Sequence, residues 1–204
     1  MYRQSLAGPP RLWDTMREIQ IRILKEQGLQ PHHILLDVGC GPLRGGVPII
    51  QYLNPNNYYG VDSNKIAVEE GKKELKDYNL ESKYPHVIHV EDFKDLKIDE
   101  TFDFIWGFSV IIHMTDVIYE DFIRFCKRKL KDNGMLLFNV NVGEWNIRSF
   151  WRTFPVNVRP FSFYKSVILK NGMVVEEIGT LDSFGYKGSD IENKQKFLKV
   201  RLQS

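Results

Sequence analysis

Apolar and polar positions recur along this chain with two different periods, which together predict a succession of helices and strands. In residues 11–28, Leu12, Met16, Ile19 and Ile23 fall on one face of a helix that ends at Gly28. The same spacing predicts helices over 44–53, 64–78, 116–130 (closed by the DNG stretch at 132–134) and 162–171. Short apolar runs predict strands over 33–38, 58–62, 86–92, 101–110, 135–142, 173–181 and 195–202.

The regular alternation of strands and helices predicts an α/β fold, in which a mostly parallel sheet is covered by helices on both faces. In such sheets, ligands bind beyond the carboxyl ends of the strands. We therefore expect the loops that could hold a ligand to lie along one rim. These loops are residues 39–46, 62–64, 91–93, 107–114 and 142–160.

Composition narrows the class of protein without identifying its function. The chain has 204 residues, 43% of them apolar, which is enough for one globular domain with a sizeable core. A net charge of +2 does not indicate a nucleic-acid or membrane partner, and the apolar run 104–114 is too short to span a bilayer. Residues 1–19 lack an apolar signal core, and Cys40 and Cys126 predict neither a disulfide framework nor a structural zinc. We expect a soluble, cytoplasmic protein.

The most informative stretch is ILLDVGCGPLRGG, residues 34–46, in which an apolar strand runs into a glycine-rich loop. A dinucleotide fingerprint would need a glycine where Arg44 stands, and a P-loop would need a Gly-Lys-Ser/Thr ending. Asp62 ends the next predicted strand, where it can accept hydrogen bonds from a ribose diol. S-adenosylmethionine fits this combination, because it has a ribose and a carboxylate that backbone N–H groups can bind.

Four motifs, in this order, resemble those of the class I S-adenosylmethionine-dependent methyltransferases, most clearly between residues 30 and 142. The motifs are LLDVGCGPLRGG, YYGVD, VEDF and FDFIWGFSVIIHM. The resemblance implies S-adenosylmethionine as cofactor and S-adenosylhomocysteine as product. It also implies the residues that line the cofactor site, namely Asp37, Gly39, Cys40, Gly41, Arg44, Asp62, Ser63, Asp92, Phe93, Gly107 and Phe108.

The resemblance further implies individual roles and a fold. Asp62 would bind the ribose, Asp92 and Phe93 would contact the adenine, and Gly107 and Phe108 would border the methionine tail. The family has a Rossmann-like, doubly wound sheet of seven strands, mostly parallel, with an antiparallel last strand. We expect the same sheet in this chain.

Two residues of the glycine-rich loop have roles that are less direct. Cys40 is expected to pack below the cofactor rather than to act as a nucleophile. The resemblance also extends to PLRGG, which recurs in a subset of small methyltransferases. For Arg44, two roles stay open: capping carbonyls or pairing with a surface acid, and neutralising an anionic group near the cofactor tail.

We expect one methyltransferase domain over residues 1–204, made of three parts. Residues 1–28 would form an N-terminal helix or lid. Residues 30–142 would form the cofactor-binding core, and residues 143–204 would form the acceptor side and the last strands.

Methyl transfer requires mainly that the acceptor be aligned with the methyl group. A hydroxyl acceptor usually needs a general base as well, and His113, after the fourth predicted strand, is the candidate. A packing or hydrogen-bonding role fits His113 equally. Asp116, Tyr119 and Glu144 are weaker candidates, and no carboxylate cluster indicates a metal.

The segment that leaves the fifth predicted strand is rich in aromatic residues and arginine. We expect Trp145, Arg148, Arg152 and Arg159 to bind the acceptor, since three arginines suit a carboxylate or phosphate. A spacing of four would place Arg148 and Arg152 on one face if 145–153 were helical. Solvated arginines on an ordinary helix are the alternative.

These observations predict an enzyme that methylates a small-molecule acceptor, with an anionic group as one option, and that has no nucleic-acid or membrane partner. Two alternatives stay open. One is a non-methylating enzyme that uses S-adenosylmethionine, such as an aminopropyl transferase, which would need carboxylates to seat a polyamine. The other is a catalytically silent cofactor-binding protein.

Overall fold

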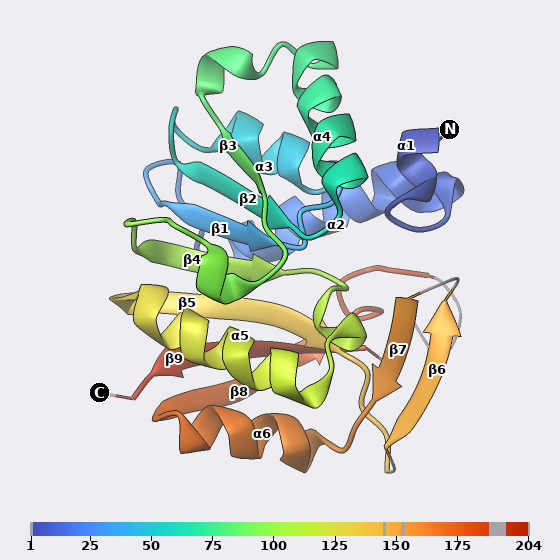
Figure 1. Ribbon diagram of the computed structural model, residues 1–204, viewed down its shortest axis with the longest axis vertical. Coiled ribbons are helices and arrows are strands. Elements are labelled where there is room, and N and C mark those ends of the chain that lie inside the picture. Colours follow the sequence, from blue (N-terminus) through green and yellow to red (C-terminus); the bar gives the residue numbers. More distant parts are fainter. Residues whose placement is uncertain (1, 145, 152–153, 188–194, 204) are drawn as a thin grey trace. The chain divides into compact units, whose positions relative to one another are not determined.

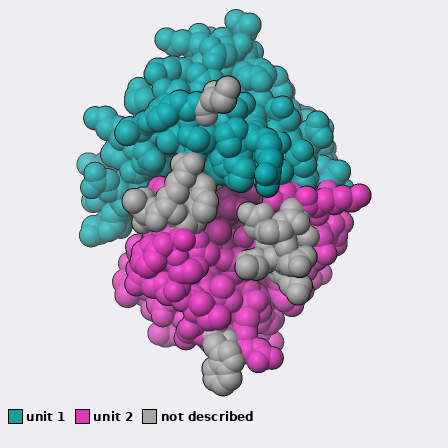
Figure 2. Space-filling view, turned by 90° about the vertical axis from the view of Figure 1, so that its right-hand side faces the viewer, with its two compact units in different colours: residues 1–104 teal, residues 105–204 magenta. Residues whose placement is uncertain are grey.

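The computed structural model describes residues 2–144, 146–151, 154–187 and 195–203. The chain divides into two compact units, residues 1–104 and 105–204, which Figure 2 shows in teal and magenta. The division falls within strand β4 (Phe102–Gly107). The prediction of a single domain in three parts stays a prediction.

Unit 1 contains most of the predicted cofactor motifs. Its elements are α1 (Tyr2–Ser5), η1 (Pro10–Leu12), α2 (Trp13–Glu26), β1 (Leu35–Val38), α3 (Gly46–Tyr52), β2 (Tyr58–Asp62), α4 (Lys65–Asp77), η2 (Glu81–Lys83), β3 (His86–His89) and η3 (Phe93–Asp95). Strand β2 pairs in parallel with β1 and β3, with Asp37 opposite Gly60 and Asp62 opposite His89. Helices α3 and α4 pack on β2, and α2 packs on α3 (Figure 1).

Unit 2 contains the predicted acceptor segment. Its elements are η4 (Ile111–His113), α5 (Asp116–Lys129), β5 (Leu130–Val140), β6 (Ile147–Trp151), β7 (Phe154–Val158), α6 (Phe161–Lys170), β8 (Met173–Thr180) and β9 (Lys196–Leu202). Strand β9 runs antiparallel to β5 and to β8, with Phe138 and Glu177 both opposite Leu198. Helix α5 packs on β5, and α6 packs on β8 (Figure 1).

The larger sheet has seven strands in the order β3-β2-β1-β4-β5-β9-β8. The last strand of the chain is therefore inserted between β5 and β8, antiparallel to both. This confirms the predicted α/β fold, a Rossmann-like seven-stranded sheet with an antiparallel last strand.

The helix boundaries follow from capping residues that the sequence displays. The Asn64 side chain accepts hydrogen bonds from the backbone N–H groups of Ile66 and Ala67, which caps α4. Thr115 caps α5 in the same way. Gly28 and Gly172, with φ of 94° and 68°, adopt left-handed conformations after α2 and α6. Among the residues described, no helix is both long and apolar enough to span a membrane.

The arginine-rich segment differs from its prediction. The described residues of 145–153 form strand β6, which pairs with β7 as a two-stranded antiparallel sheet. Ile147 and Phe150 belong to the β-branched and aromatic types that favour strands. The helix on which a shared face of Arg148 and Arg152 depended is therefore not formed at Ile147–Trp151, and Arg152 lies outside the described residues.

Two further features differ from the prediction, the start of strand β5 and an additional helix at the N-terminal end. Strand β5 begins at Leu130, directly after α5, so the DNG stretch at 132–134 lies in a strand rather than closing the helix. Leu130 is buried and already extended, which turns the chain from helix to strand without a separate loop. Helix α1 is not foreseen in the sequence, and none of its residues is buried.

Candidate active site

The glycine loop, residues 39–46 between β1 and α3, has a backbone that favours glycine. Gly39 and Gly41 have φ of 71° and 53°, in the left-handed region. The N–H groups of Gly39 and Cys40 donate to the Val61 carbonyl at 2.8 and 3.1 Å, which ties the loop to β2. A Cβ on Gly41 would meet no atom within 4 Å, so the backbone here borders open space.

Asp62, the last residue of β2, is joined to the glycine loop. Its Oδ2 accepts a hydrogen bond from the Gly41 N–H at 2.8 Å, and its Oδ1 accepts one from the Asn64 N–H at 2.7 Å. Burial raises the pKa of the Asp62 carboxyl, although both N–H groups favour the ionised form. Each oxygen keeps a further lone pair, so the carboxylate can still accept hydrogen bonds from a ribose diol.

Asp37, in β1, is a buried carboxyl that changes charge near neutral pH. The Tyr58 hydroxyl donates a hydrogen bond to its Oδ2 at 2.7 Å. Burial raises the pKa of Asp37 to about 7, although this hydrogen bond lowers it. Gly60 makes room for the arrangement, because a Cβ there would lie 3.0 Å from the Tyr58 ring and 3.1 Å from the Cys40 side chain.

Cys40 is suited to packing rather than to nucleophilic chemistry. Its side chain is buried, and burial raises the pKa of the thiol well above its usual value. The thiol therefore stays protonated, whereas a nucleophile would have to be a thiolate. Contact of Cys40 with the cofactor stays a prediction.

The predicted adenine-side residues lie at the ends of β2 and β3. The Asp92 side chain caps η3 by accepting a hydrogen bond from the Lys94 N–H at 3.0 Å, and this bond lowers the pKa of Asp92. The Ser63 carbonyl lies 3.2 Å from His89 Nε2, which joins the end of β2 to β3. Phe93 opens η3 and is partly exposed. Their contacts with the adenosine remain predictions.

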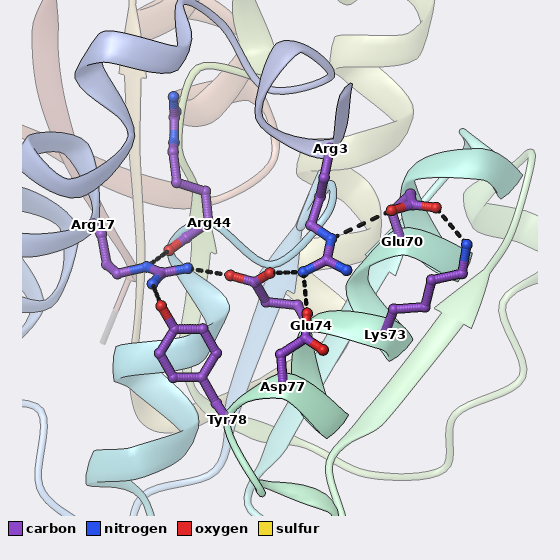
Figure 3. Close-up of polar contacts among 8 residues, drawn as sticks. All are labelled: Arg3, Arg17, Arg44, Glu70, Lys73, Glu74, Asp77 and Tyr78. Atoms are coloured by element: carbon purple, nitrogen blue, oxygen red, sulfur yellow. Dashed lines mark hydrogen bonds and ion pairs between the residues drawn. The ribbon is translucent and has the colours of Figure 1, made fainter. Parts of the chain in front are cut away.

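Arg44 connects the glycine loop to the N-terminal part of the chain. Its guanidinium Nη1 donates a hydrogen bond to the Ala7 carbonyl at 2.5 Å. The Arg44 carbonyl accepts one from Arg17 Nε at 3.0 Å, and Figure 3 shows this contact. The arginine therefore caps a carbonyl, and its predicted role near the cofactor tail is not needed to explain its position.

The geometry of unit 1 fits S-adenosylmethionine. Asp62 offers a carboxylate to a ribose diol, and the glycine loop borders open space with its backbone. N–H groups at the start of the following helix suit the carboxylate of an amino-acid tail. When bound, the cofactor supplies a methyl group that is already activated. Asp62 and the glycine loop would hold and orient it.

In unit 2, the turn after β4 is fixed by a buried amide. Asn139 Oδ1 accepts a hydrogen bond from the Ser109 N–H at 2.6 Å, and Ser109 has a φ of 56°. Gly107 and Phe108 are both buried, and a Cβ on Gly107 would lie 3.3 Å from the Val110 side chain. The two residues predicted to border the methionine tail thus lie at the end of β4 and at the start of the turn that follows it.

His113, in η4, has its tautomer set by a backbone carbonyl. Its Nδ1 lies 2.6 Å from the Pro155 oxygen, which can only accept, so Nδ1 carries the proton and Nε2 is the acceptor. Burial lowers the pKa of His113, more than the hydrogen bond raises it. A neutral imidazole with a free lone pair on Nε2 is the form that a general base needs.

The weaker base candidates, Asp116, Tyr119 and Glu144, lie in three different environments. Asp116 Oδ1 pairs with Arg159 Nη2 at 2.7 Å, and the same nitrogen donates to the Met114 carbonyl at 2.7 Å. Tyr119 is buried, which raises the pKa of its hydroxyl well above the usual value. Glu144 is exposed. In the part of the chain that the structure describes, no three His, Cys, Asp or Glu side chains are grouped to hold a metal ion.

The predicted acceptor residues fall into different environments. Arg148 is exposed on β6, with its guanidinium 5.7 Å from the centre of the Phe150 ring. Arg159 is buried, and Asp116 balances its charge. Trp145 and Arg152 lie outside the described residues. Their role in binding the acceptor stays a prediction.

A group of buried amides that the sequence analysis missed joins η4 to β7. Asn157 Nδ2 donates to the carbonyls of Ile112 and Met114, both at 3.1 Å. Asn141 Nδ2 donates to the Asn157 carbonyl at 3.3 Å, and its buried Oδ1 has no hydrogen-bond partner among the described residues. The available signal is the NVNV stretch at 139–142, where amides occupy a strand that is otherwise apolar.

Comparison with known proteins places this geometry in a family. A family model described as a methyltransferase domain matches residues 36–136. An S-adenosylmethionine-dependent methyltransferase from Clostridium acetobutylicum is 12% identical, with a TM-score of 0.70 over 94% of this chain and 92% of that chain. Magnesium protoporphyrin IX methyltransferase from Synechocystis with bound S-adenosylmethionine is 15% identical, with a TM-score of 0.69 over 92% and 79%.

The glycopeptide N-methyltransferase MtfA, complexed with S-adenosylmethionine, is 10% identical, with a TM-score of 0.71 over 93% of this chain and 94% of that chain. At these identities the solved structures show a common fold, and the family model adds the methyltransferase domain from β1 into β5. Residues 36–136 are therefore a methyltransferase domain, and the chain has the fold of the class I S-adenosylmethionine-dependent methyltransferases.

Proposed function

We propose that this methyltransferase acts on a small-molecule acceptor that carries an anionic group. The observation that carries the proposal is the hairpin β6–β7, on which Arg148 and the Phe150 ring are both exposed. Residues 146–159 contain no acid, so nothing within the hairpin balances the charge of Arg148. A guanidinium beside an aromatic ring suits a carboxylate or phosphate that is attached to an apolar group.

The hairpin is held next to the candidate base. The Pro155 carbonyl accepts the hydrogen bond from His113, and the Phe154 ring lies 5.7 Å from the imidazole. Asn157 adds two hydrogen bonds to the backbone on either side of His113. An acceptor bound on the hairpin would therefore be bound close to His113.

We infer that His113 serves as the general base when the acceptor is a hydroxyl. Nε2 would take the proton that the hydroxyl loses as its oxygen bonds to the methyl carbon, while the bond from that carbon to the cofactor sulfur breaks and S-adenosylhomocysteine is left. The lowered pKa of His113 keeps the imidazole neutral at physiological pH, which supports this role. An amine that binds in its neutral form would not need this step.

The names of similar enzymes support an acceptor other than nucleic acid. One is a magnesium protoporphyrin IX methyltransferase and another is a glycopeptide N-methyltransferase. Among the described arginines of the acceptor segment, Arg159 is already paired with Asp116. The anionic part of the proposal therefore depends on Arg148.

The test is a screen of metabolites for methylated product, using matched pairs in which the anionic group is free or esterified. We expect product from free acids or phosphates. For the best acceptor, Arg148→Gln should raise KM about ten- to a hundredfold, because one charge-assisted hydrogen bond contributes about 1.5–3 kcal/mol. The affinity for S-adenosylhomocysteine should not change.

Arg201→Gln is the matched control, since Arg201 is also an exposed arginine of unit 2 but lies on β9. Its KM should equal that of the wild type. A preference for the esterified partner of each pair, or equal KM values for the two variants, would contradict an anionic acceptor.

A further inference from the structure

The N-terminal strap, residues Tyr2–Gly8, lies against α4 and the glycine loop without adding to the core. Helix α1 has no buried residue, and four residues are too few for a helix that is stable by itself. A cavity of about 610 Å³ is lined by side chains of α1, α2 and α4. The strap is therefore held by polar contacts rather than by close apolar packing.

Two arginines attach the strap to the rest of unit 1, and each attachment is called a fastening below. The first fastening is made by Arg3. Its guanidinium pairs with Glu70 at 3.3 Å, with Asp77 at 2.7 Å and with Glu74. These carboxylates lie seven residues apart at most, on one face of α4, and Figure 3 shows them converging on Arg3. The Arg3 side chain is only 21% exposed, so water screens these ion pairs less than it would at an open surface.

The second fastening is Arg44, which belongs to the glycine loop. Its Nη1 donates to the Ala7 carbonyl at 2.5 Å, near the end of the strap. The next residue, Gly8, has a φ of 119°, and a Cβ there would lie 3.4 Å from the same nitrogen. Glycine suits this position because residues with a side chain rarely adopt this φ.

Glu74 connects the two fastenings. It is buried, and while its Oε2 pairs with Arg3, its Oε1 pairs with Arg17 Nη2 at 2.6 Å. Arg17 in turn donates from Nε to the Arg44 carbonyl at 3.0 Å and from Nη1 to the Tyr78 hydroxyl at 2.7 Å. A continuous set of hydrogen bonds thus joins the strap, α4, α2 and the glycine loop (Figure 3).

The charges of this cluster favour a fastening over a site for a separate cation. The three carboxylates of α4 each pair with Arg3, Glu70 pairs also with Lys73 at 2.6 Å, and Glu74 pairs also with Arg17. The partners that a bound cation would need are therefore already taken.

We propose that the strap is part of the cofactor-binding machinery, with Arg3 and Arg44 as positioning residues for the glycine loop. Only two residues separate Arg44 from Gly41, whose N–H donates to Asp62. A bound cofactor would limit the conformations of this loop. A loop limited in this way would keep the Arg44 guanidinium bonded to the Ala7 carbonyl of the strap. Cofactor binding and fastening of the strap must then favour each other to the same extent. This inference depends on the cofactor and not on the nature of the acceptor.

The test measures both directions of this coupling on the full chain, with S-adenosylhomocysteine as the probe. In hydrogen exchange, the amides of Leu6 and Ala7, which are bonded within the strap, should exchange more slowly when the probe is bound. By calorimetry, Arg3→Gln should weaken binding of the probe about tenfold, within the range usual for coupled sites. Lys73→Gln is the control, because it removes the positive charge that pairs with Glu70 but leaves the contacts of Arg3 and Arg44 in place.

A double-mutant cycle separates the two possible roles of Arg44. If Arg44 acts through the strap, Arg3→Gln should cause little further loss of affinity in an Arg44→Gln background. Additive losses would mean that Arg44 touches the cofactor itself, and they would overturn the coupling.

Unfolding of Arg3→Gln must be told apart from loss of coupling. The melting temperature of the free variant should stay close to that of the wild type, and Arg3→Lys, which keeps one ion pair, should recover part of the affinity. The proposal would be overturned if hydrogen exchange of the strap amides were unchanged by S-adenosylhomocysteine. It would also be overturned if Arg3→Gln and Lys73→Gln bound S-adenosylhomocysteine with equal affinity.

Discussion

The glycine loop of unit 1 is fixed mainly through its backbone, whereas the hairpin β6–β7 of unit 2 is fixed by a few side chains. In the loop, backbone N–H groups bond to Val61 and Asp62, and two glycines have left-handed φ angles. In the hairpin, His113 and Asn157 hold β7, while Ile147 and Phe150 on β6 are 55% and 66% exposed. The contacts with Val61 join backbone to backbone and do not depend on side chains, whereas Asp62 and Arg44 add side-chain contacts to the loop. The exposed side chains of the hairpin can vary without changing these contacts.

This difference indicates which residues determine cofactor affinity and which determine the choice of acceptor. Substitutions near the loop should change cofactor affinity for every acceptor. Substitutions on the exposed side of the hairpin should change the acceptor that is used, with little effect on the cofactor or on stability. The three predictions below test this separation, from the largest effect to the smallest.

The largest effect is expected at Asp62. Asp62→Ala removes the carboxylate that bonds to Gly41 and Asn64 and that would bind the ribose diol. Two charge-assisted hydrogen bonds at about 1.5–3 kcal/mol each predict that S-adenosylhomocysteine binds at least about a hundredfold more weakly. Calorimetry checks this value, and Asp92→Ala, at the end of β3, should have a smaller effect. Unchanged affinity in Asp62→Ala would show that the cofactor binds elsewhere.

On the hairpin side, His113→Gln should lower turnover of a hydroxyl acceptor about a hundredfold and leave cofactor affinity unchanged. In the wild type, the rate should rise with pH with its midpoint below the ordinary histidine pKa of 6.5, because burial lowers the pKa of His113. Steady-state kinetics from pH 5 to 8 would show this. A flat profile with near-normal turnover would return His113 to a structural role and favour an amine acceptor.

The smallest effect concerns stability near the loop. The pKa of Asp37 is raised to about 7 in the folded state, from an ordinary 3.8. Between these values the folded chain keeps a proton that the unfolded chain has released, so stability falls as pH rises through this window. From pH 5 to 7 the loss should be about 2 kcal/mol, at 1.36 kcal/mol per pKa unit.

Asp37→Asn should remove this contribution, because an amide does not titrate and can still accept the hydrogen bond from Tyr58. Urea unfolding of both proteins at the two pH values isolates the difference, since the other titrating groups are shared. An equal loss of stability in both proteins would show that Asp37 is ionised throughout.

The cofactor side could be predicted because its constraints are local in sequence. Asp62 directly ends a strand, Asn64 caps the helix that follows, and the glycines occur where the backbone has left-handed φ angles. Each of these features is decided by residues within a few positions. A single sequence therefore contains enough information to locate them.

The remaining features depend on partners far along the chain. Arg17 is a buried arginine on an otherwise amphipathic helix, and its partner Glu74 lies 57 residues away. Arg148 and Arg152 are spaced as on a helix, but Ile147–Trp151 pair with β7 as a strand. Residues 146–150 are all exposed, so they have no buried face to set a pattern and periodicity could not identify the strand.

The binding site of the cofactor can be determined by a crystal structure of the protein with S-adenosylhomocysteine. We expect both ribose hydroxyls to donate to the Asp62 carboxylate and the amino-acid tail to contact the N–H groups of the glycine loop. A nucleoside bound away from Asp62, with the glycine loop free of ligand, would contradict this expectation.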